Sequence, residues 1–147
     1  MGNLIDNIQE SEYPEVVDLW EDSVRATHNF LKEEDIQFFK PLILNEYLKM
    51  VDLRCIRDYN RKILGFLGVV EKNIEMLFIH PNSRGGGIGK QLLKFAIDEL
   101  GTTKVDVNED NDQALGFYKH HGFEVISRSE LDPTGRPYPV LHMELPK

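Results

Sequence analysis

Apolar residues recur along the chain with two different periods, and these periods divide it into predicted helices and strands. From Pro14 onward they repeat every three or four residues, which is the spacing of one helix face. This stripe consists of Val16, Trp20, Val24, Thr27 and Leu31. Residues 34–50 carry a second helical pattern, in which Pro41 predicts a break or a kink. The first third of the chain is therefore expected to be mainly helical.

A strand pattern replaces the helical one at residue 53 and continues to residue 80. The segments LRCIRDY, ILGFLGVV and IEMLFIH are rich in β-branched and aromatic residues and predict three successive antiparallel strands. Helical patterns at 88–100 and 112–121 then alternate with strand patterns at 104–108, 123–129 and 140–145. With a short first strand at 4–8, this order predicts an α/β fold in which helices cover a central mixed sheet.

Length and composition narrow the class of protein. The 147 residues predict one domain over 1–147, and no apolar run approaches the roughly 18 residues of a membrane helix. The single cysteine, Cys55, cannot form an internal disulfide, and no Cys or His cluster has the spacing of a zinc site. The opening residues MGNLIDNIQE lack the basic and apolar blocks of a secretory signal. We therefore expect a soluble cytoplasmic protein without a metal.

The charge excludes one class of partner. Twenty-five acidic and seventeen basic residues give a formal net charge of −8. Because such a surface repels a phosphate backbone, we expect no nucleic-acid partner. No segment of the sequence marks an oligomer interface, so the oligomeric state stays open.

The segment SRGGGIGKQLL, residues 83–93, carries the first candidate chemistry, with glycines at 85, 86, 87 and 89. A strand, a glycine-rich loop and a helix N-terminus together form an anion site, because free backbone N–H groups and the helix dipole converge there. The spacing of a nucleotide-hydrolase P-loop fails, since Arg84 stands where its first glycine should be and Gln91 replaces its Ser or Thr. The dinucleotide pattern G-x-G-x-x-G fails as well. What remains is Arg-x-x-Gly-x-Gly.

At this point the sequence resembles a known family. LFIHPNSRGGGIGKQLL is similar to motif A of the GNAT superfamily of N-acetyltransferases, and VDVNEDNDQALGFYKHHGF is similar to a second signature of that family. The second match is carried by Asn111, Ala114, Tyr118, Gly122 and Phe123. WEDSVRATHNFL and SRSELDPTGRPYPVL narrow the resemblance to a group of small bacterial acetyltransferases.

The resemblance implies a fold and a cosubstrate. The GNAT fold is a mixed, mostly antiparallel sheet of about seven strands, flanked by about four helices and splayed at a cleft for acetyl-CoA. The backbone of Leu77, Phe78 and Ile79 would bind pantetheine and the acetyl carbonyl and stabilise the developing oxyanion. Asn111 would cap a helix and also contact coenzyme A. The residues that would hold the pyrophosphate are Arg84, Gly85, Gly86, Gly87, Ile88, Gly89 and Lys90.

The same resemblance gives Tyr118 the role of the general acid, which protonates the departing thiolate. A base must also deprotonate the acceptor ammonium. Asp106 and Glu75 are ranked level for this role, His28 comes third, and a chain of water molecules is a further alternative. His28 and Trp20 are expected to line the acceptor pocket. Helix one and residues 34–50 and 131–139 should wall that pocket.

The predicted function is direct acetyl transfer from acetyl-CoA to a primary amine of a small molecule or peptide. An acetyl-enzyme on Cys55 is disfavoured, because nothing near it in sequence supplies a base and a buried strand thiol explains it. Two alternatives stay open. One is a non-catalytic acyl-CoA sensor or regulatory module, and a weaker one is a glycine loop that binds another phosphate ligand.

Overall fold

The computed structural model describes residues 5–27 and 31–146, which form one seven-stranded sheet in the order β1-β2-β3-β4-β5-β7-β6. All neighbouring strands are antiparallel except β4 and β5. The strands are β1 Ile5–Asn7, β2 Asp52–Arg57, β3 Ile63–Val70, β4 Asn73–Ile79, β5 Lys104–Asn108, β6 Glu124–Ser129 and β7 Val140–Glu144. The helical elements are η1 Glu10–Glu12, α1 Tyr13–Thr27, α2 Glu33–Leu42, η2 Ile43–Tyr47, α3 Leu48–Met50, η3 Pro81–Ser83, α4 Ile88–Leu100 and α5 Asp112–His120. The predicted fold class is confirmed.

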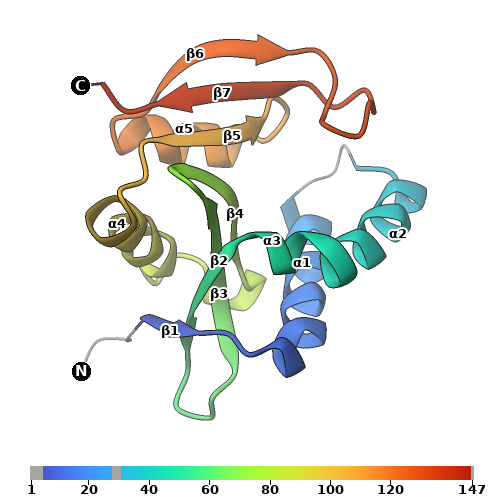
Figure 1. The fold of residues 1–147 in the computed structure, drawn as a ribbon, viewed down its shortest axis with the longest axis vertical. Coiled ribbons are helices and arrows are strands. Elements are labelled where there is room, and N and C mark those ends of the chain that lie inside the picture. The colour runs from blue at the N-terminus through green and yellow to red at the C-terminus, as the bar shows by residue number, and fades with distance from the viewer. Residues whose placement is uncertain (1–4, 28–30, 147) are drawn as a thin grey trace.

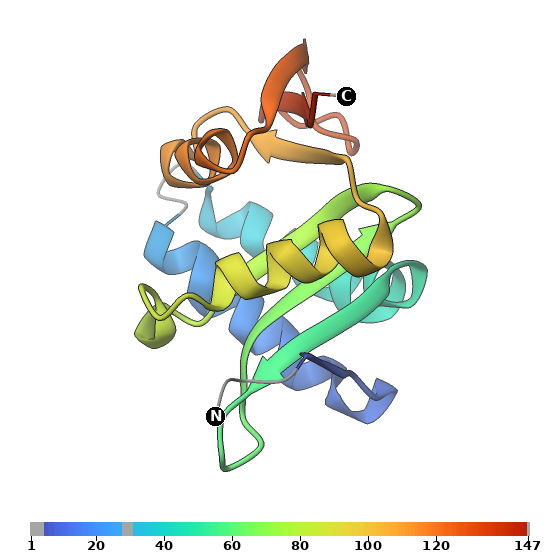
Figure 2. The same ribbon diagram turned by 90° about the vertical axis from the view of Figure 1, so that its left-hand side faces the viewer.

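The helices cover the sheet from both sides and give it two hydrophobic cores (Figures 1 and 2). On one side α1, α2 and η2 bury Trp20, Ile36 and Ile43 against β2 and β3. On the other side α4 and α5 pack Leu92 and Tyr118 against the sheet. None of the helices within the described ranges is long and apolar enough to cross a membrane.

The helical region before β2 differs from the prediction in two details. Helix α1 ends at Thr27, so Leu31 lies outside it although it still packs against the same core. Pro41 lies inside α2 and does not break it, because the chain continues through the π-helix η2 into α3. Proline lacks the N–H that an α-helix needs, and a change to wider π-type bonding just beyond it keeps the helical path without a break.

The sheet divides between β4 and β5. These parallel strands pair only through Asn73 with Lys104 and Ile74 with Val105. Beyond these pairs they diverge, while β4 stays paired with β3 as far as Ile79 (Figure 1). The last residues of β4 therefore have no neighbouring strand on the β5 side, which gives the splayed cleft that the sequence predicted.

A β-bulge lies in β4 next to this divergence. Gly68 of β3 is opposite Met76, but the next residue, Val69, is opposite Ile74, so Glu75 is the extra residue. A bulge changes which face successive side chains point to. Consequently Ile74 joins the core under α4, Met76 joins the core under α1, and Glu75 between them stays exposed to the cleft.

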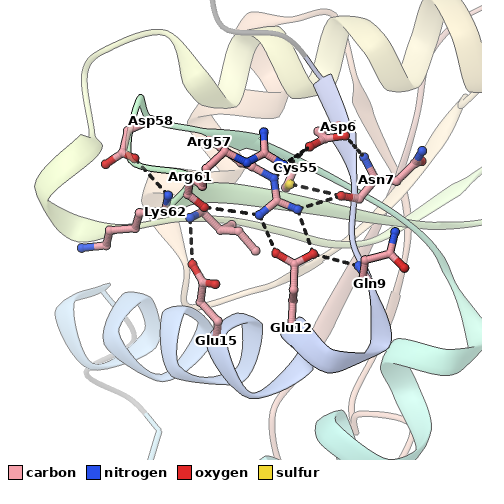
Figure 3. A network of polar contacts seen from close by, with 11 residues as sticks. Asp6, Asn7, Gln9, Glu12, Glu15, Cys55, Arg57, Asp58, Arg61 and Lys62 are labelled. Carbon is pink, nitrogen blue, oxygen red and sulfur yellow. Dashed lines mark hydrogen bonds and ion pairs between the residues drawn. The ribbon is translucent and has the colours of Figure 1, made fainter.

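A buried arginine fixes the N-terminal edge of the sheet (Figure 3). The side chain of Arg57, at the end of β2, is only 7% exposed and forms ion pairs with Asp6 at 2.9 Å and Glu12 at 2.6 Å. Its guanidinium also donates to the backbone carbonyl of Asn7 at 2.9 Å. One cation thus ties β2 to β1 and to the start of the helical layer.

We expect Arg57→Gln to lower the free energy of unfolding by about 2–3 kcal/mol, because it removes the cation from two carboxylates that are partly buried. Arg61→Gln is the matched control. Arg61 is 73% exposed and pairs with Asp6 at 3.2 Å, so its loss should cost less than about 1 kcal/mol. Urea unfolding measures both, and equal losses would contradict the central role of Arg57.

The stabilisation that Arg57 provides should depend on pH, and the direction follows from the same contacts. Hydrogen bonds from Arg57 hold the pKa values of Asp6 and Glu12 below their usual range. The stabilisation is therefore present above the pKa values of the unfolded chain, near about 4, and lost as the pH falls through the folded-state values. The difference between wild type and Arg57→Gln should narrow in acid, as unfolding curves at several pH values would show.

Candidate functional site

Three adjoining cavities follow the divergence of β4 and β5. The loop cavity, about 340 Å³, lies at the glycine loop, and the central cavity, about 290 Å³, lies between the diverging strands. The outer cavity, about 490 Å³, lies towards β6 and β7. Tyr118, Asn111 and Phe78 line both the loop and central cavities, whereas Glu75 and Asp106 line both the central and outer ones. Shared walls therefore place the three cavities next to one another along the cleft.

The glycine loop has a backbone that other residues rarely adopt. Gly85 and Gly87 have φ angles of 82° and 80°, in the left-handed region that favours glycine. Gly87 is the N-cap of α4 and supplies no side-chain hydrogen bond there. The N–H groups of the first turn of α4 have no partner within the helix, so they and the helix dipole offer a site for an anion.

The structure brings most of the predicted loop residues to one wall. Six of the seven residues expected to hold a pyrophosphate line the loop cavity, and Gly86 does not. Arg84 spans this cavity, donating to Gln113 of α5 at 2.7 Å and to Ser23 of α1 at 3.4 Å. Desolvation lowers the pKa of Arg84 from its usual value, but the guanidinium of an arginine stays charged in proteins. A cation and free N–H groups therefore face the same space.

The end of β4 forms the floor of the cleft. Leu77 and Phe78 line the loop and central cavities, and Ile79 lines the loop cavity. The pairing of β4 with β5 has ended before these residues. These residues therefore have no β5 strand beside them and lie at the cleft.

Helix α5 places the next two predicted residues. The side-chain oxygen of Asn111 accepts a hydrogen bond from the N–H of Ala114 at 3.1 Å, so the predicted capping role is confirmed. Tyr118 is 5% exposed, and its ring contacts Phe117 and Phe123 edge-on at centroid distances of 5.2 and 5.6 Å. Burial raises the pKa of Tyr118 above its usual value. Its hydroxyl is therefore protonated at neutral pH.

Glu75 and Asp106, the two carboxylates ranked level as bases, lie on facing strands of the cleft. Desolvation raises the pKa of Glu75, the Asn73 amide bonded to it acts in the opposite direction, and the charge of Asp106 raises it further. Asp106 is not a lone carboxylate, because its Oδ1 lies 2.7 Å from Nδ1 of His142. Nε2 of the same ring lies 2.7 Å from Oγ of Ser129.

His142 and Ser129 are residues that the sequence analysis missed. Ser129 is separated from His142 by 13 positions and His142 from Asp106 by 36, so no local motif joins the three. One signal was available. Asp106 and His142 both occupy polar positions of strands whose neighbours are apolar, and such positions share the face opposite the core.

Three further residues were singled out from the sequence, namely Trp20, His28 and Cys55. Trp20 is 5% exposed in the core under α1 and also lines the central cavity. His28 lies outside the described residues. Cys55 is fully buried, and desolvation raises the pKa of its thiol to about 11. Because a thiolate is the reactive form, this environment opposes an acetyl-enzyme on Cys55.

Comparisons with known proteins identify the family of the chain. The family model described as acetyltransferase (GNAT) domain matches residues 53–125. The peptidyl-lysine N-acetyltransferase YjaB of Salmonella typhimurium is 36% identical to the chain over 143 residues, covering 95% of the chain and 98% of the relative. The chain belongs to the GNAT acetyltransferase family. The predicted family and its narrower resemblance are confirmed, as is the enzyme class, an N-acetyltransferase that uses acetyl-CoA.

Solved structures show the same fold. The apo solution structure of YjaB from Escherichia coli has a TM-score of 0.87 at 35% identity, covering 98% of this chain and 97% of that one. The PaiA N-acetyltransferase of Thermoplasma acidophilum, crystallised with coenzyme A, has a TM-score of 0.74 at 20% identity and full coverage of both chains. At that identity the likeness shows the fold alone.

Within residues 5–27 and 31–146, no group of three or more His, Cys, Asp and Glu side chains could hold a metal ion.

The two glycines that flank α4 test the loop cavity. Gly87 and Gly101 have φ angles of 80° and 68°, and an added Cβ would meet no atom within 4 Å at either. Gly87→Ala and Gly101→Ala should therefore lower stability similarly, by about 1 kcal/mol. Only Gly87 lines the cavity, so we expect Gly87→Ala alone to raise the Kd for acetyl-CoA, by about tenfold. Titration calorimetry checks this, and an equal rise in both variants would argue against the loop as the binding site.

Proposed function

We propose that this GNAT enzyme transfers the acetyl group of acetyl-CoA directly to a lysine side chain of a peptide or protein. The observation that carries the proposal is the charge of the central and outer cavities. Their walls contain the carboxylates of Glu75, Asp106 and Asp132, and among the described residues no lysine or arginine lines either cavity. Such a site attracts a cationic amine. The printed names of the YjaB relatives, peptidyl-lysine N-acetyltransferases, support the same acceptor class.

The apolar wall of the outer cavity fits the aliphatic stem of a lysine. Phe39 and Tyr47 of the helical layer and Met50 of α3 line the same cavity as the carboxylates. A lysine side chain packs its methylene groups against apolar surface, while its ammonium remains in contact with water or with acidic groups. Of the three segments that were expected to wall the acceptor pocket, residues 34–50 and 131–139 contribute to both cavities, whereas helix α1 contributes to the central cavity and not to the outer one.

Contacts between the two segments hold this wall in place. Arg136, in the loop between β6 and β7, pairs with Asp35 of α2 at 3.0 Å. Its guanidinium also lies 3.5 Å from the ring centroid of Phe38, as a cation–π contact. The hydroxyl of Tyr138 donates to the other carboxylate oxygen of Asp35. The loop and α2 therefore act as one rigid side of the acceptor site.

The cosubstrate would occupy the opposite end of the cleft. Arg84 and the first-turn N–H groups of α4 would hold its pyrophosphate, and the backbone of Leu77, Phe78 and Ile79 would hold the pantetheine arm and the acetyl carbonyl. Acetyl-CoA supplies the activated thioester. Its reacting end would then lie in the central cavity beside Glu75, Asp106 and Tyr118.

Tyr118 would serve as the general acid. It lines the central cavity, where the thioester sulfur would lie, and its burial keeps the hydroxyl protonated. When the amine nitrogen bonds to the carbonyl carbon and the carbon–sulfur bond breaks, the hydroxyl proton of Tyr118 passes to the thiolate. The nitrogen then gives up its second proton, which replaces the one that Tyr118 has lost, so that the neutral amide, the free thiol and the protonated tyrosine result. A protonated donor at this point avoids the release of a free thiolate.

The function is tested by thiol release from acetyl-CoA with three acceptors, namely a blocked lysine peptide, a peptide with only a free N-terminal amine, and a small polyamine. We expect release with the lysine peptide to exceed release with the other two by at least tenfold. Preference for the polyamine or the N-terminal amine would overturn the acceptor class. Tight binding of acetyl-CoA with no release for any amine would instead support the acyl-CoA sensor.

Tyr118→Phe should lower kcat about 10²-fold, which is within the range that general-acid catalysis contributes. The Kd for acetyl-CoA should stay within about twofold of wild type, because the ring and its edge-on contacts are kept. Steady-state kinetics and calorimetry give the two values. A parallel loss of binding and turnover would show that the residue is structural.

A further inference from the structure

Ser129, His142 and Asp106 form a hydrogen-bonded chain at the wall of the outer cavity. The three residues come from adjacent strands, since β7 lies between β5 and β6. Asp106 and His142 are direct partners in the β5–β7 register. Both hydrogen bonds of the ring are 2.7 Å long, and all three side chains line the outer cavity.

The hydrogen bonds determine which ring nitrogen can accept a proton. An ionised carboxylate only accepts hydrogen bonds, so the Nδ1 that faces Asp106 carries the ring proton. In the neutral ring Nε2 is then an acceptor, and the hydroxyl of Ser129 donates to it. The basic nitrogen of His142 is therefore directed towards Ser129, and Asp106 holds the ring in that tautomer.

We propose that Ser129, His142 and Asp106 form the relay that removes the proton from the acceptor ammonium. This inference rests on the proposed function. An N–H bond of the ammonium breaks and leaves its electron pair on nitrogen, the Ser129 oxygen gains that proton, and it passes its own proton to Nε2 of His142. Asp106 stabilises the imidazolium that forms, and the freed electron pair attacks the thioester.

Reference acidities favour an imidazole over a lone carboxylate in this step. The equilibrium constant for proton transfer from a lysine ammonium to an ordinary carboxylate is unfavourable by about six powers of ten. For transfer to an imidazole it is unfavourable by about four powers of ten. The raised pKa of Glu75 reduces its disadvantage, and Glu75 is therefore the main competitor. The side chain of His142 is 32% exposed, so the proton can leave to solvent after each turnover.

The pH dependence of the relay involves every titratable group that faces it. These groups are Asp106 of β5, Glu75 of β4, Asp132 of the loop after β6, and Tyr47 of η2. Removing the ring should therefore leave the carboxylates to govern the acid limb of the pH profile. We expect the acid limb of kcat/KM to move to lower pH in His142→Gln.

The decisive experiment compares two acceptors that differ only in the charge of the amine. One is a blocked tripeptide with a central lysine, and the other carries an isosteric side chain that ends in an aminooxy group, which is neutral at pH 7 and needs no base. The variants are His142→Gln and Ser129→Ala. Ser127→Ala is the matched control, because Ser127 is opposite His142 in the β6–β7 register but does not take part in the relay.

For the lysine peptide we expect kcat/KM to fall at least 10²-fold in His142→Gln and about tenfold in Ser129→Ala, as general-base catalysis implies. For the aminooxy peptide both variants should stay within about threefold of wild type, and Ser127→Ala should match wild type on both. Equal losses on the two acceptors would show a merely structural role and overturn the relay. An unchanged acid limb in His142→Gln, together with its loss in Glu75→Gln, would assign the base to Glu75.

These outcomes are distinct from failure of the proposed function. If wild type releases thiol with the lysine peptide and Tyr118→Phe slows it, acetyl transfer to lysine stands whatever the His142 variants do. If wild type does not acetylate the lysine peptide, both the function and the relay are overturned.

Discussion

The divergence of two parallel strands is the constraint on which the rest of the cleft depends. Because β4 and β5 pair through only two residue pairs, the strand ends separate inside an otherwise continuous sheet. A sheet normally pairs its backbone groups between neighbouring strands, and an internal gap interrupts that pairing and opens a cleft. Helix α5 follows β5 and so places Tyr118 at the gap, while the glycine loop follows β4 and places a helix N-terminus there. Both ends of the proposed cosubstrate site thus come from one topological feature.

The bulge at Glu75 adds the second half of the site. An uninterrupted strand would place residues 74 and 76 on one face, whereas here they enter opposite cores. The extra residue directs a carboxylate into the cleft. It follows directly after Ile74, where the pairing between β4 and β5 ends and these two strands begin to diverge. On the facing strand, the carboxylate of Asp106 is hydrogen-bonded to the ring of His142. The two carboxylates therefore have different environments although the sequence ranked them level.

Periodicity and motif spacing were sufficient to predict the elements, their order and the glycine loop, because these depend on residues close in sequence. The end of α1 before Leu31 and the π-helix after Pro41 were not predicted, since both depend on packing and on bonding beyond the local pattern. The bulge was also missed, because register depends on the partner strand. Ser129 and His142 could not be joined to Asp106 from sequence, because only strand order brings them together. The assignments of Glu75, Tyr118 and the loop residues to catalysis and binding stay predictions.

The acidic walls of the outer cavity bear on how a turnover ends. An ammonium that enters is attracted by Glu75, Asp106 and Asp132. Acetylation converts it into a neutral amide, so the attraction disappears in the same step that completes the reaction. Under the proposed function, the chemistry itself therefore weakens the hold on the product, and the next cationic side chain competes for the site with the advantage of its charge.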